Sequence, residues 1–373
     1  MSCNPEALFG SAVLGKQSIA ARLRSRGRLK PQYLSALTIV GEELKFMPLA
    51  GIPVEPPPPA AELFDRSVAL TGPGALARLS GIRVAVVGAS GPGSIMIELL
   101  MRTGVWEIVV FDFDRADITN LNRVLHLRAR DAEARQLKSL RFAEVVNETG
   151  LQSTVTIIGG GDIRDDTVAQ ELRACDLIFG CVDRDWPRLI MSEVAYQYLI
   201  PYIDLGSEVG ATETDVQSVD ARVSLVGPGR PCLVCSKAIR YDGLRPEGLE
   251  DDEKPRVLRM GYSAGLRLRA PSVMDLNMRS ASAAMLFAGH MFQPFLAAPL
   301  PHSFKEAVTN FSIRHLIFTR QDDCPICGSF ESDRPRRRFP FDDTKAIVGN
   351  RLHTAPIRPT SPLIGTSKLS GFV

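Results

Sequence analysis

The sequence has no apolar run that reaches the roughly 18 residues needed to cross a bilayer. It has no excess of charge either, because 44 Lys and Arg residues balance 42 Asp and Glu residues to a net charge of +2 at pH 7. Its N-terminus lacks the basic start, apolar segment and cleavage site of a signal peptide. We therefore expect a cytoplasmic protein without a membrane span. Basic clusters at 22–30 and 334–338 fall in terminal segments and predict solvated surface rather than nucleic-acid binding.

Cysteines that could serve as nucleophiles are also scarce. The sequence holds seven cysteines, of which Cys3 lies in the terminal segment. Cys175 and Cys181 flank a predicted strand, where we expect them in the core. The other four form two Cys-x-x-Cys pairs, Cys232 with Cys235 and Cys324 with Cys327.

Two such pairs supply four thiolates, which is the ligand set of a closed, structural zinc site. They lie too far apart in the sequence for a compact zinc ribbon, so the fold must bring them together. Neither pair contains a histidine, and a catalytic zinc is therefore not expected. The alternative is a group of buried or reactive thiols without a metal.

The composition is that of an ordinary globular protein, with 45% hydrophobic and 23% charged residues in 373. Residues 1–60 form an accessory segment in which 17–24 and 32–44 are expected as short helices, and a proline-rich linker follows at 55–61. Residues 61–330 are expected to form the main domain. Residues 331–373, rich in Pro, Arg and Ser, predict a flexible tail.

One stretch organises the main domain. An apolar segment with the β-branched residues of a buried strand, 83–87, runs into a turn that contains Gly88, Gly91 and Gly93. A helical pattern follows at 94–103, and a second strand at 108–111 ends on Asp112. Strand, glycine turn, helix, strand and terminal acid are the parts of a nucleotide-binding βαβ unit. Glycines let the backbone approach a phosphate, and an acid at this position accepts hydrogen bonds from a ribose.

Strands and helices continue to alternate beyond this unit, which predicts an α/β fold with a doubly wound, mostly parallel (Rossmann-like) sheet. An alternating pattern at 215–226 then predicts an antiparallel extension. A mobile acidic loop is expected at 247–254. The remaining predicted helices are 72–79, 137–147, 166–173, 186–198 and 274–292; the remaining strands are 153–158, 177–180, 202–205 and a strand pair or hairpin arm at 310–318.

Cations follow the second strand of the unit. Asn120-Leu121-Asn122-Arg123 and Lys138 lie downstream of Asp112. A dinucleotide oxidoreductase does not need them, whereas an enzyme that cleaves ATP between the α- and β-phosphates uses cations to neutralise the triphosphate. Taken singly, Arg123 and Lys138 are more simply explained as ordinary surface residues, but their joint occurrence after an intact βαβ unit favours the ATP-cleaving site.

These residues resemble the ThiF/MoeB/HesA superfamily, the bacterial relatives of ubiquitin-activating enzymes. The usual pattern is G-x-G-G-x-G, D-x-D, N-L-x-R, a lysine, and D-N after a later strand. Here Ser90 replaces one glycine, and Arg184 replaces the asparagine after Asp183. Upstream, Phe64-Asp65-Arg66 resembles R-Y-x-R-Q, with Ser67 in place of the glutamine. The matching residues are Gly88, Gly91, Gly93, Asp112, Asp114, Asn120, Arg123, His126, Lys138, Asp183, Arg188 and Arg66.

The resemblance implies ATP-dependent adenylation of a carboxylate, with the C-terminal glycine of a small ubiquitin-like or sulfur-carrier protein as substrate. It implies that Arg123, Lys138 and, across a homodimer interface, Arg66 stabilise the transferring phosphate. Asp183 and Asp114 would hold Mg²⁺, and the four paired cysteines would bind Zn²⁺. No further cysteine lies between Asp204 and Ser303, so an enzyme that stops at the adenylate, without a thioester, is expected.

Other readings of the same residues stay open. Within the same chemistry, one alternative substrate is the C-terminus of a small peptide, and another is a tRNA base. The glycine turn and Asp112 alone also suit an NAD-dependent oxidoreductase. The changes at Ser67, Ser90 and Arg184 leave room for a non-catalytic scaffold or pseudoenzyme.

Overall fold

An eight-stranded sheet forms the centre of the computed structural model. The structure describes residues 8–14, 19–25, 32–34, 36–39, 45–48, 62–151, 153–158, 161–211, 216–239, 272–296 and 299–328. The strand order is β13-β12-β11-β10-β9-β6-β7-β8. The parallel strands are β6 (Arg83–Val87), β7 (Glu107–Phe111), β8 (Thr154–Ile158), β9 (Leu177–Gly180) and β10 (Tyr202–Ala211).

The chain winds outward from the middle of this sheet in two directions. From β6 it moves to β7 and β8, then returns to β9 on the other side of β6 and continues to β10. The order therefore reverses between β6 and β9. Ligands of such sheets bind in the crevice outside the carboxyl ends of the strands at this switch point.

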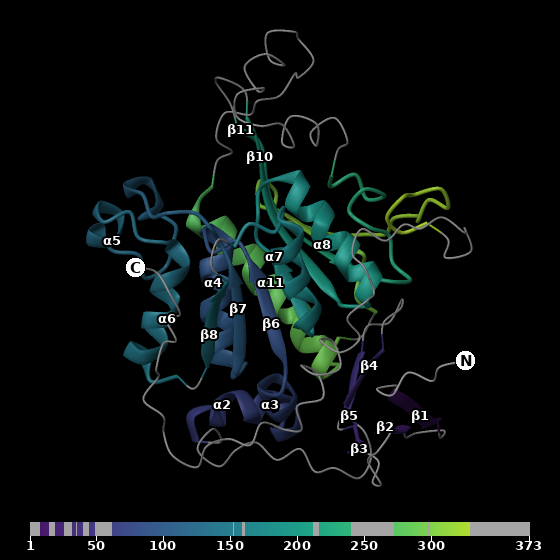
Figure 1. The fold of residues 1–373 in the computed structure, drawn as a ribbon. Helices are drawn as coiled ribbons and strands as arrows, with labels where there is room; N and C mark the ends of the chain where they lie inside the picture. The colour runs from purple at the N-terminus through teal and green to yellow at the C-terminus, as the bar shows by residue number, and fades with distance from the viewer. Residues whose placement is uncertain are drawn as a thin grey trace.

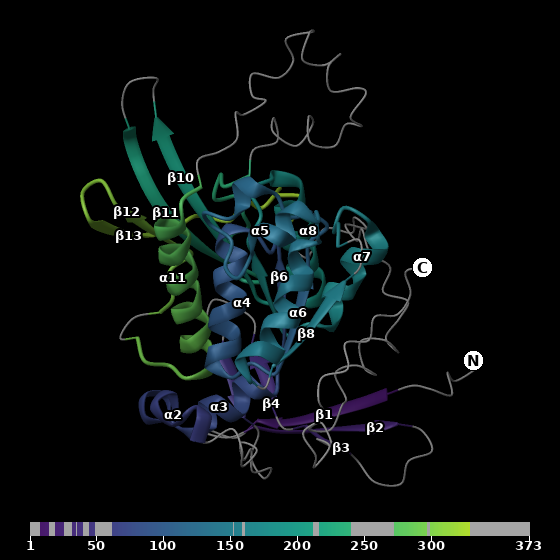
Figure 2. The ribbon, with the colours of Figure 1, turned by 90° about the vertical axis from the view of Figure 1, so that its left-hand side faces the viewer.

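Helices cover both faces of the sheet (Figures 1 and 2). On one face, α4 (Gly91–Thr103), α6 (Lys138–Thr149) and α11 (Met274–Phe292) contribute to a core with Val84, Val86 and Ile108. On the other, α7 (Asp166–Gln170), the 3₁₀ turn η2 (Glu171–Ala174) and α8 (Asp185–Tyr198) pack over Ala85, Val87 and the paired cysteines. Strands buried on both faces explain why these segments read as continuous apolar runs.

Two short helices, α2 (Asp65–Thr71) and α3 (Pro73–Ser80), lie at the amino ends of the parallel strands, at the bottom of Figure 1. Phe64 and Leu76 form a small cluster there. Gly104, which ends α4 in the left-handed conformation, lies against both. Because α4 starts at the carboxyl edge of the sheet and ends here, this cluster marks the opposite edge from the glycine turn.

Beyond β10 the sheet turns antiparallel, as predicted. β10 forms a long hairpin with β11 (Val216–Val226), which projects at the top of both views. Two further antiparallel strands, β12 (Ser303–Ala307) and β13 (Ser312–Leu316), complete the edge. The sequence predicts a final strand pair or hairpin arm at 310–318, and β13 lies within that range. The sequence does not predict β12, which lies before the range, because Ser303, Lys305 and Glu306 give this segment little strand signal.

The N-terminal expectation of helices at 17–24 and 32–44 is wrong. β1 (Leu8–Leu14) pairs antiparallel with β2 (Ile19–Ser25), which also pairs with β3 (Gln32–Tyr33). β4 (Ala36–Ile39) and β5 (Lys45–Pro48) form another hairpin. Cross-strand pairing outweighs local helix propensity here.

Four sequence expectations lie outside the described residues: the proline-rich linker at 55–61, the acidic loop at 247–254, Cys3 and the tail at 331–373. The α/β fold with a mostly parallel, doubly wound sheet is confirmed. Among the described residues, no helix has the length and apolar character of a membrane span.

Candidate nucleotide and metal sites

The glycine turn joins β6 to α4 at the switch point. Gly88 has a φ of +90°, a conformation that side chains with a Cβ rarely adopt. A Cβ on Gly93 would lie 1.7 Å from the Gly88 carbonyl oxygen, so only glycine fits. The turn therefore brings the backbone and the first turn of α4 close together at the carboxyl edge, where an anion finds N–H groups and the positive end of the helix.

Asp112 ends β7 beside this turn and is 7% exposed. Its carboxylate accepts the Ala89 N–H at 2.6 Å and the Asp114 N–H at 2.7 Å. Burial raises the pKa of the Asp112 carboxyl, although the Ala89 hydrogen bond and the charge of Lys138 act against that rise. A carboxylate has about four acceptor positions, so it can still accept from a ligand hydroxyl.

Lys138 begins α6 and is 5% exposed. Its ammonium lies 2.9 Å from the Asp114 carboxylate, and its N–H donates to the Asp114 carbonyl at 3.1 Å. The predicted cation and the D-x-D motif thus meet at one point, although Lys138 lies far along the chain. Asp114 itself is about half exposed, so its carboxylate is accessible to a cation.

Asn120 and Arg123 lie on the turn that follows β7, around η1 (Ile118–Asn120). Asn120 is buried, and its side-chain oxygen accepts the Asp117 N–H at 3.1 Å. In this structure Asn120 therefore shapes the turn. The Arg123 guanidinium donates to the Thr119 carbonyl and to the Asn122 side chain at 3.1 Å, which leaves further guanidinium donors for a phosphate.

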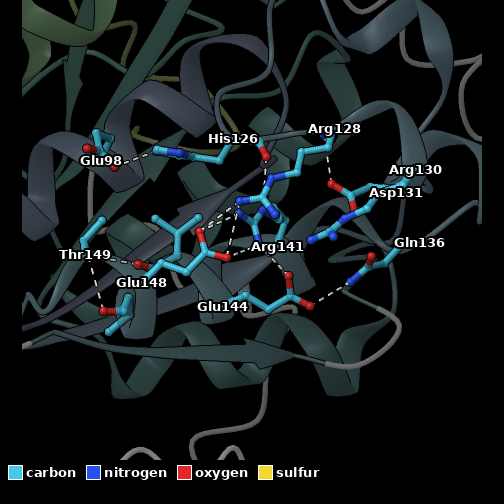
Figure 3. Close-up of polar contacts among 12 residues, drawn as sticks. Glu98, His126, Arg128, Arg130, Asp131, Gln136, Arg141, Glu144, Glu148 and Thr149 are labelled. Carbon is cyan, nitrogen blue, oxygen red and sulfur yellow. Dashed lines mark hydrogen bonds and ion pairs between the residues drawn. The ribbon is translucent and has the colours of Figure 1, made fainter.

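A second set of polar residues lies behind this turn, between α4 and α6, and motif reasoning found only His126 of it (Figure 3). Arg141 in α6 donates to the His126 carbonyl at 3.1 Å and pairs with Glu144 and Glu148. The His126 ring in turn contacts Glu98 of α4 at 2.9 Å. The short helix α5 (Ala129–Glu133) follows, capped by the Asp131 side chain.

The end of β9 carries Asp183, which is exposed at the carboxyl edge, followed by Arg184, also exposed. The predicted arginine of the next helix, Arg188, is buried instead. It lies 3.2 Å from Asp204, which also pairs with Arg222 at 2.8 Å. Burial alone would lower the pKa of Arg188, but the charges of Asp204, Asp185 and other acidic neighbours together outweigh it, and the pKa lies above its ordinary value.

Further residues at the site escaped the motif comparison. The Arg164 guanidinium lies 5.9 Å from the centre of the Phe113 ring, next to Asp112, and Asp162 holds Arg164 in place. On the other side, the buried Asn277 of α11 packs against Gly91. The pattern gave no signal for these positions, because each partner comes from a distant part of the chain.

Arg66 does not join these residues within one chain. It is exposed on α2, at the amino ends of the strands, whereas the glycine turn lies at their carboxyl ends (Figure 1). A role at the nucleotide site would require Arg66 of another subunit.

The four paired cysteines meet below the antiparallel hairpin. Their ligand atoms all lie within 4.8 Å of one another, and all four residues are buried. Cys232 Sγ lies 3.6 Å from Cys324 Sγ, and Cys235 Sγ lies 3.4 Å from Cys327 Sγ. A tetrahedral zinc with Zn–S bonds of about 2.3 Å holds its sulfurs about 3.8 Å apart, so this cluster fits the ion with little movement.

The thiols of the cluster differ in acidity. The hydrogen bond with Cys232 lowers the pKa of Cys327 to about 5. Burial raises the pKa of Cys235 to about 12. The remaining described cysteines, Cys175 and Cys181, are buried in the core as predicted, and burial raises the pKa of the Cys181 thiol. A buried thiol of raised pKa is a poor nucleophile.

A model of the ThiF family matches residues 64–328, which include the glycine turn, both cations and all four clustered cysteines. This chain belongs to the ThiF family.

Curated relatives of this ThiF-family chain include the ubiquitin-like modifier-activating enzyme 5 of Drosophila mojavensis. It is 26% identical over 199 residues, which cover 51% of this chain and 49% of the relative. The enzyme of the same name from Bombyx mori is 25% identical over 214 residues, with 54% and 53% covered. The chain thus spans about half the length of these relatives.

Among solved structures, E. coli MccB with ATP has 17% identity and a TM-score of 0.55, and the match covers 71% of this chain and 74% of that one. MccB in complex with N-formylated MccA has 18% identity and a TM-score of 0.56, with 71% and 75% covered. At this identity the likeness establishes the shared fold.

Proposed function

We propose that this chain adenylates a carboxylate with ATP. The observation that carries the proposal is the nearly buried Lys138 ammonium, held beside Asp112 and Asp114 at the carboxyl edge of the sheet. A lysine that is this buried is retained where its charge has a partner. Asp114 is half exposed and can give way to a phosphate, so the lysine is positioned for an anionic ligand.

The proposed reaction is an in-line displacement. A carboxylate oxygen of the substrate attacks the α-phosphorus, and the bond from that phosphorus to the bridging oxygen breaks. Pyrophosphate leaves with the electron pair, and the product is a mixed anhydride of the substrate and AMP. Positioning and charge stabilisation provide most of the catalysis in such a transfer.

The site residues take distinct roles in this scheme. Asp112 accepts hydrogen bonds from the ribose, and the start of α4 faces the phosphates. The base lies along the flat surface of Phe113 and Arg164. Arg123 and Lys138 neutralise charge on the leaving pyrophosphate. Arg66 of a second subunit completes the site in a homodimer.

Magnesium fits the same edge. Asp114 and Asp183 are exposed there, and carboxylate oxygens are ligands that Mg²⁺ prefers. Bound Mg²⁺ would supply divalent charge to the triphosphate. The chain's own contribution is to present these two carboxylates on either side of the glycine turn.

For the substrate we propose the C-terminal glycine of a small ubiquitin-like or sulfur-carrier protein, in line with the curated relatives named for activating ubiquitin-like modifiers. A short peptide is the alternative, because MccB has been solved with MccA. A tRNA base remains a third substrate for the same chemistry.

Zinc would be structural, held by Cys232, Cys235, Cys324 and Cys327. No cysteine outside this cluster lies at the described nucleotide site with a thiol suited to attack, so we propose that the reaction ends at the adenylate. The cytoplasm, which keeps thiols reduced, is the compartment that fits this cluster of cysteine thiols. Residues 61–330 would act as the adenylation domain, with 1–60 as an accessory segment.

Calorimetry with Mg·ATP against NAD tests the proposal. We expect the wild-type chain to bind ATP and not NAD, and Lys138→Ala to lose most of the ATP affinity. Lys305→Ala is the matched control, because Lys305 is also a lysine paired with carboxylates, Asp220 and Glu208, but lies on β12. Tight NAD binding, or equal ATP binding by both variants, would refute the assignment.

A non-catalytic scaffold is the second candidate, favoured by Arg184. This exposed cation stands directly after Asp183, where the family pattern has a neutral asparagine. A scaffold of this kind would bind ATP yet form no adenylate with any carboxylate substrate. An Arg184→Asn variant that gains adenylation activity would support this candidate.

A further inference from the structure

Arg141 is a buried arginine that none of the nucleotide motifs contains. Its side chain is 2% exposed. Two of its nitrogens pair with carboxylates, Nη1 with Glu144 at 2.6 Å and Nη2 with Glu148 at 2.7 Å. The third nitrogen, Nε, donates to the His126 carbonyl at 3.1 Å. Figure 3 shows the guanidinium surrounded by these partners.

The contact with His126 is the one that leaves α6. His126 has a φ of +63°, in the left-handed region that residues with a Cβ adopt only when their surroundings hold them there. Two groups hold it: Arg141 binds its carbonyl, and Glu98 of α4 binds its ring. The backbone at this point is therefore fixed from both helices.

This backbone belongs to the loop 121–128, which starts at the phosphate motif. Arg123 lies on it, and the buried Val124 anchors it in the core. The Leu125 N–H donates to Ser94 Oγ in the first turn of α4, at 3.1 Å. Four contacts thus join the loop to α4 and α6, the fourth being the exposed ion pair of Arg128 with Glu148. The first turns of these two helices form the proposed nucleotide site.

We infer that Arg141 is a positioning residue for the phosphate-binding cations. Arg141 follows Lys138 by about one helical turn, so the same helix carries the lysine and the group that holds the loop of Arg123. Loss of Arg141 frees the loop and lets Arg123 move away from Lys138. This inference rests on the proposed ATP site, since it concerns the geometry of its two cations.

The energetic cost of losing Arg141 falls on the loop rather than on the core. Glu144 and Glu148 are about half exposed, so water solvates them when the guanidinium is absent. The partly buried His126 carbonyl loses its donor, and the left-handed residue loses one of its two restraints. Methionine preserves the length and apolar character of the Arg141 stem, so Arg141→Met is the variant of choice.

Calorimetry with ATP and with AMP distinguishes a specific displacement of the two phosphate-binding cations from a general loss of nucleotide binding. We expect Arg141→Met to bind ATP about tenfold more weakly, the effect of one charge-assisted hydrogen bond, and to bind AMP as the wild type does. AMP lacks the β- and γ-phosphates, so it does not report on both cations. Arg141→Lys should behave like Arg141→Met, because one ammonium cannot reach both carboxylates and the carbonyl.

Arg128→Met is the matched control. The Arg128 side chain also pairs with Glu148, at 3.2 Å, but it is 45% exposed, and it is Arg141 that donates to the His126 carbonyl. We expect its ATP affinity to stay within twofold of the wild type. If both variants lost affinity equally, the charge balance around Glu148 would explain the effect and positioning by Arg141 would be refuted.

Amide hydrogen exchange of the nucleotide-free chains provides an independent measurement. Amides of 121–128 should exchange faster in Arg141→Met than in the wild type, and the strands β6 and β7 should be unchanged. Unchanged exchange in the loop, or unchanged ATP affinity, would overturn the inference. If the wild type bound no ATP, the proposed function would fail, while the exchange data would still decide whether Arg141 fixes the loop.

Discussion

Asp112 serves the fold and the proposed ligand with one carboxylate. It receives N–H groups from both sides of the βαβ unit, Ala89 in the glycine turn and Asp114 after β7. A carboxylate in this position locks the turn to the end of β7. The same oxygens are oriented toward the edge where a ribose would lie.

As the pH is lowered, ATP binding should weaken at a higher pH than it would if Asp112 had the pKa of an ordinary aspartate. Burial raises the pKa of Asp112, so it takes up its proton above the usual value of about 3.9. Affinity should therefore fall as the pH is lowered through this raised pKa. The protonated carboxyl is not destabilising, because an acid with a raised folded-state pKa contributes more to stability as the pH falls.

Calorimetry between pH 7 and pH 5, with thermal unfolding in parallel, would separate the two effects. Asp112→Asn should show weak ATP binding with little pH dependence over this interval. A wild-type affinity that declines no faster than that of the variant would contradict the role of Asp112.

Gly91 should tolerate no side chain while Asn277 is present. A Cβ on Gly91 would lie 2.3 Å from the Asn277 side-chain nitrogen, and Asn277 is held by Ser272 at 3.2 Å. Gly91→Ala should cost about 1–3 kcal/mol in the free energy of unfolding, as overpacking does. Gly91→Ala combined with Asn277→Ala should cost less than the sum of the two single changes. Urea unfolding of the four chains measures the difference, and strict additivity would refute the clash.

The sequence identifies some site residues and misses others for a physical reason. Asp112, Lys138 and the cysteine pairs stand in local motifs whose spacing reflects one βαβ unit or one knuckle. Arg141 and Asn277 act through partners on other elements, so their neighbourhood exists only in the folded chain. Without the structure each reads as an ordinary helical residue.

At the scale of elements, prediction succeeds where packing and local pattern agree. The apolar segment at 83–87 becomes β6, and 274–292 becomes α11 with the same bounds. It fails for β2 and for β12, whose sequences alternate weakly and depend on a partner strand for their hydrogen bonds. These two segments form strands because hydrogen bonds to a partner strand stabilise them.

The cysteine cluster connects two elements that the sheet leaves apart. Cys232 and Cys235 follow β11, and Cys324 and Cys327 follow β13. A zinc ion at this point would fix the C-terminal end of the described chain to the turn after the hairpin.

We predict about one zinc per chain, removed by Cys232→Ser. The variant should also unfold at a lower temperature, because metal binding contributes directly to the stability of such sites. Metal analysis and thermal unfolding measure the two effects. Cys175→Ala, which removes a buried thiol outside the cluster, should retain the zinc. A metal-free wild-type protein prepared without chelator would contradict the prediction.

At the scale of the whole molecule, Asp204 joins the parallel half of the sheet to its antiparallel extension. It is fully buried on β10, with Arg188 of α8 on one side and Arg222 of β11 on the other. The Tyr202 hydroxyl donates to it at 2.7 Å. This carboxylate is thus the nearest partner of two largely buried positive charges.

Asp204→Asn should destabilise the chain by about 3–5 kcal/mol, because it removes the nearest carboxylate from both guanidinium groups and leaves only the longer contacts of Arg188 with Asp185, at 3.8 Å, and of Arg222 with Glu208. Glu208→Gln is the control: this half-exposed carboxylate also faces Arg222, at 3.9 Å, and should cost less than about 1 kcal/mol. Denaturant unfolding compares the two variants. Equal effects would show that the buried cluster contributes no more than a surface pair.

The candidate site residues are divided between the two ends of the sheet. The carboxyl edge gathers Asp112, Lys138 and Asp183, whereas Arg66 lies at the amino edge on α2. A single chain would therefore supply the proposed ATP site without this arginine. The proposal of a homodimer follows from that separation, since Arg66 reaches a nucleotide only on another subunit.

Exchange of labelled pyrophosphate into ATP tests the central claim most directly. With Mg·ATP and a substrate that ends in a free carboxylate, either a small carrier protein ending in glycine or a short peptide, the wild-type chain should catalyse exchange that requires this substrate. Lys138→Ala should show none, and Lys305→Ala should match the wild type. Exchange that persists in Lys138→Ala would contradict the account of the site, and a wild type that binds ATP without exchange on any such substrate would contradict adenylation.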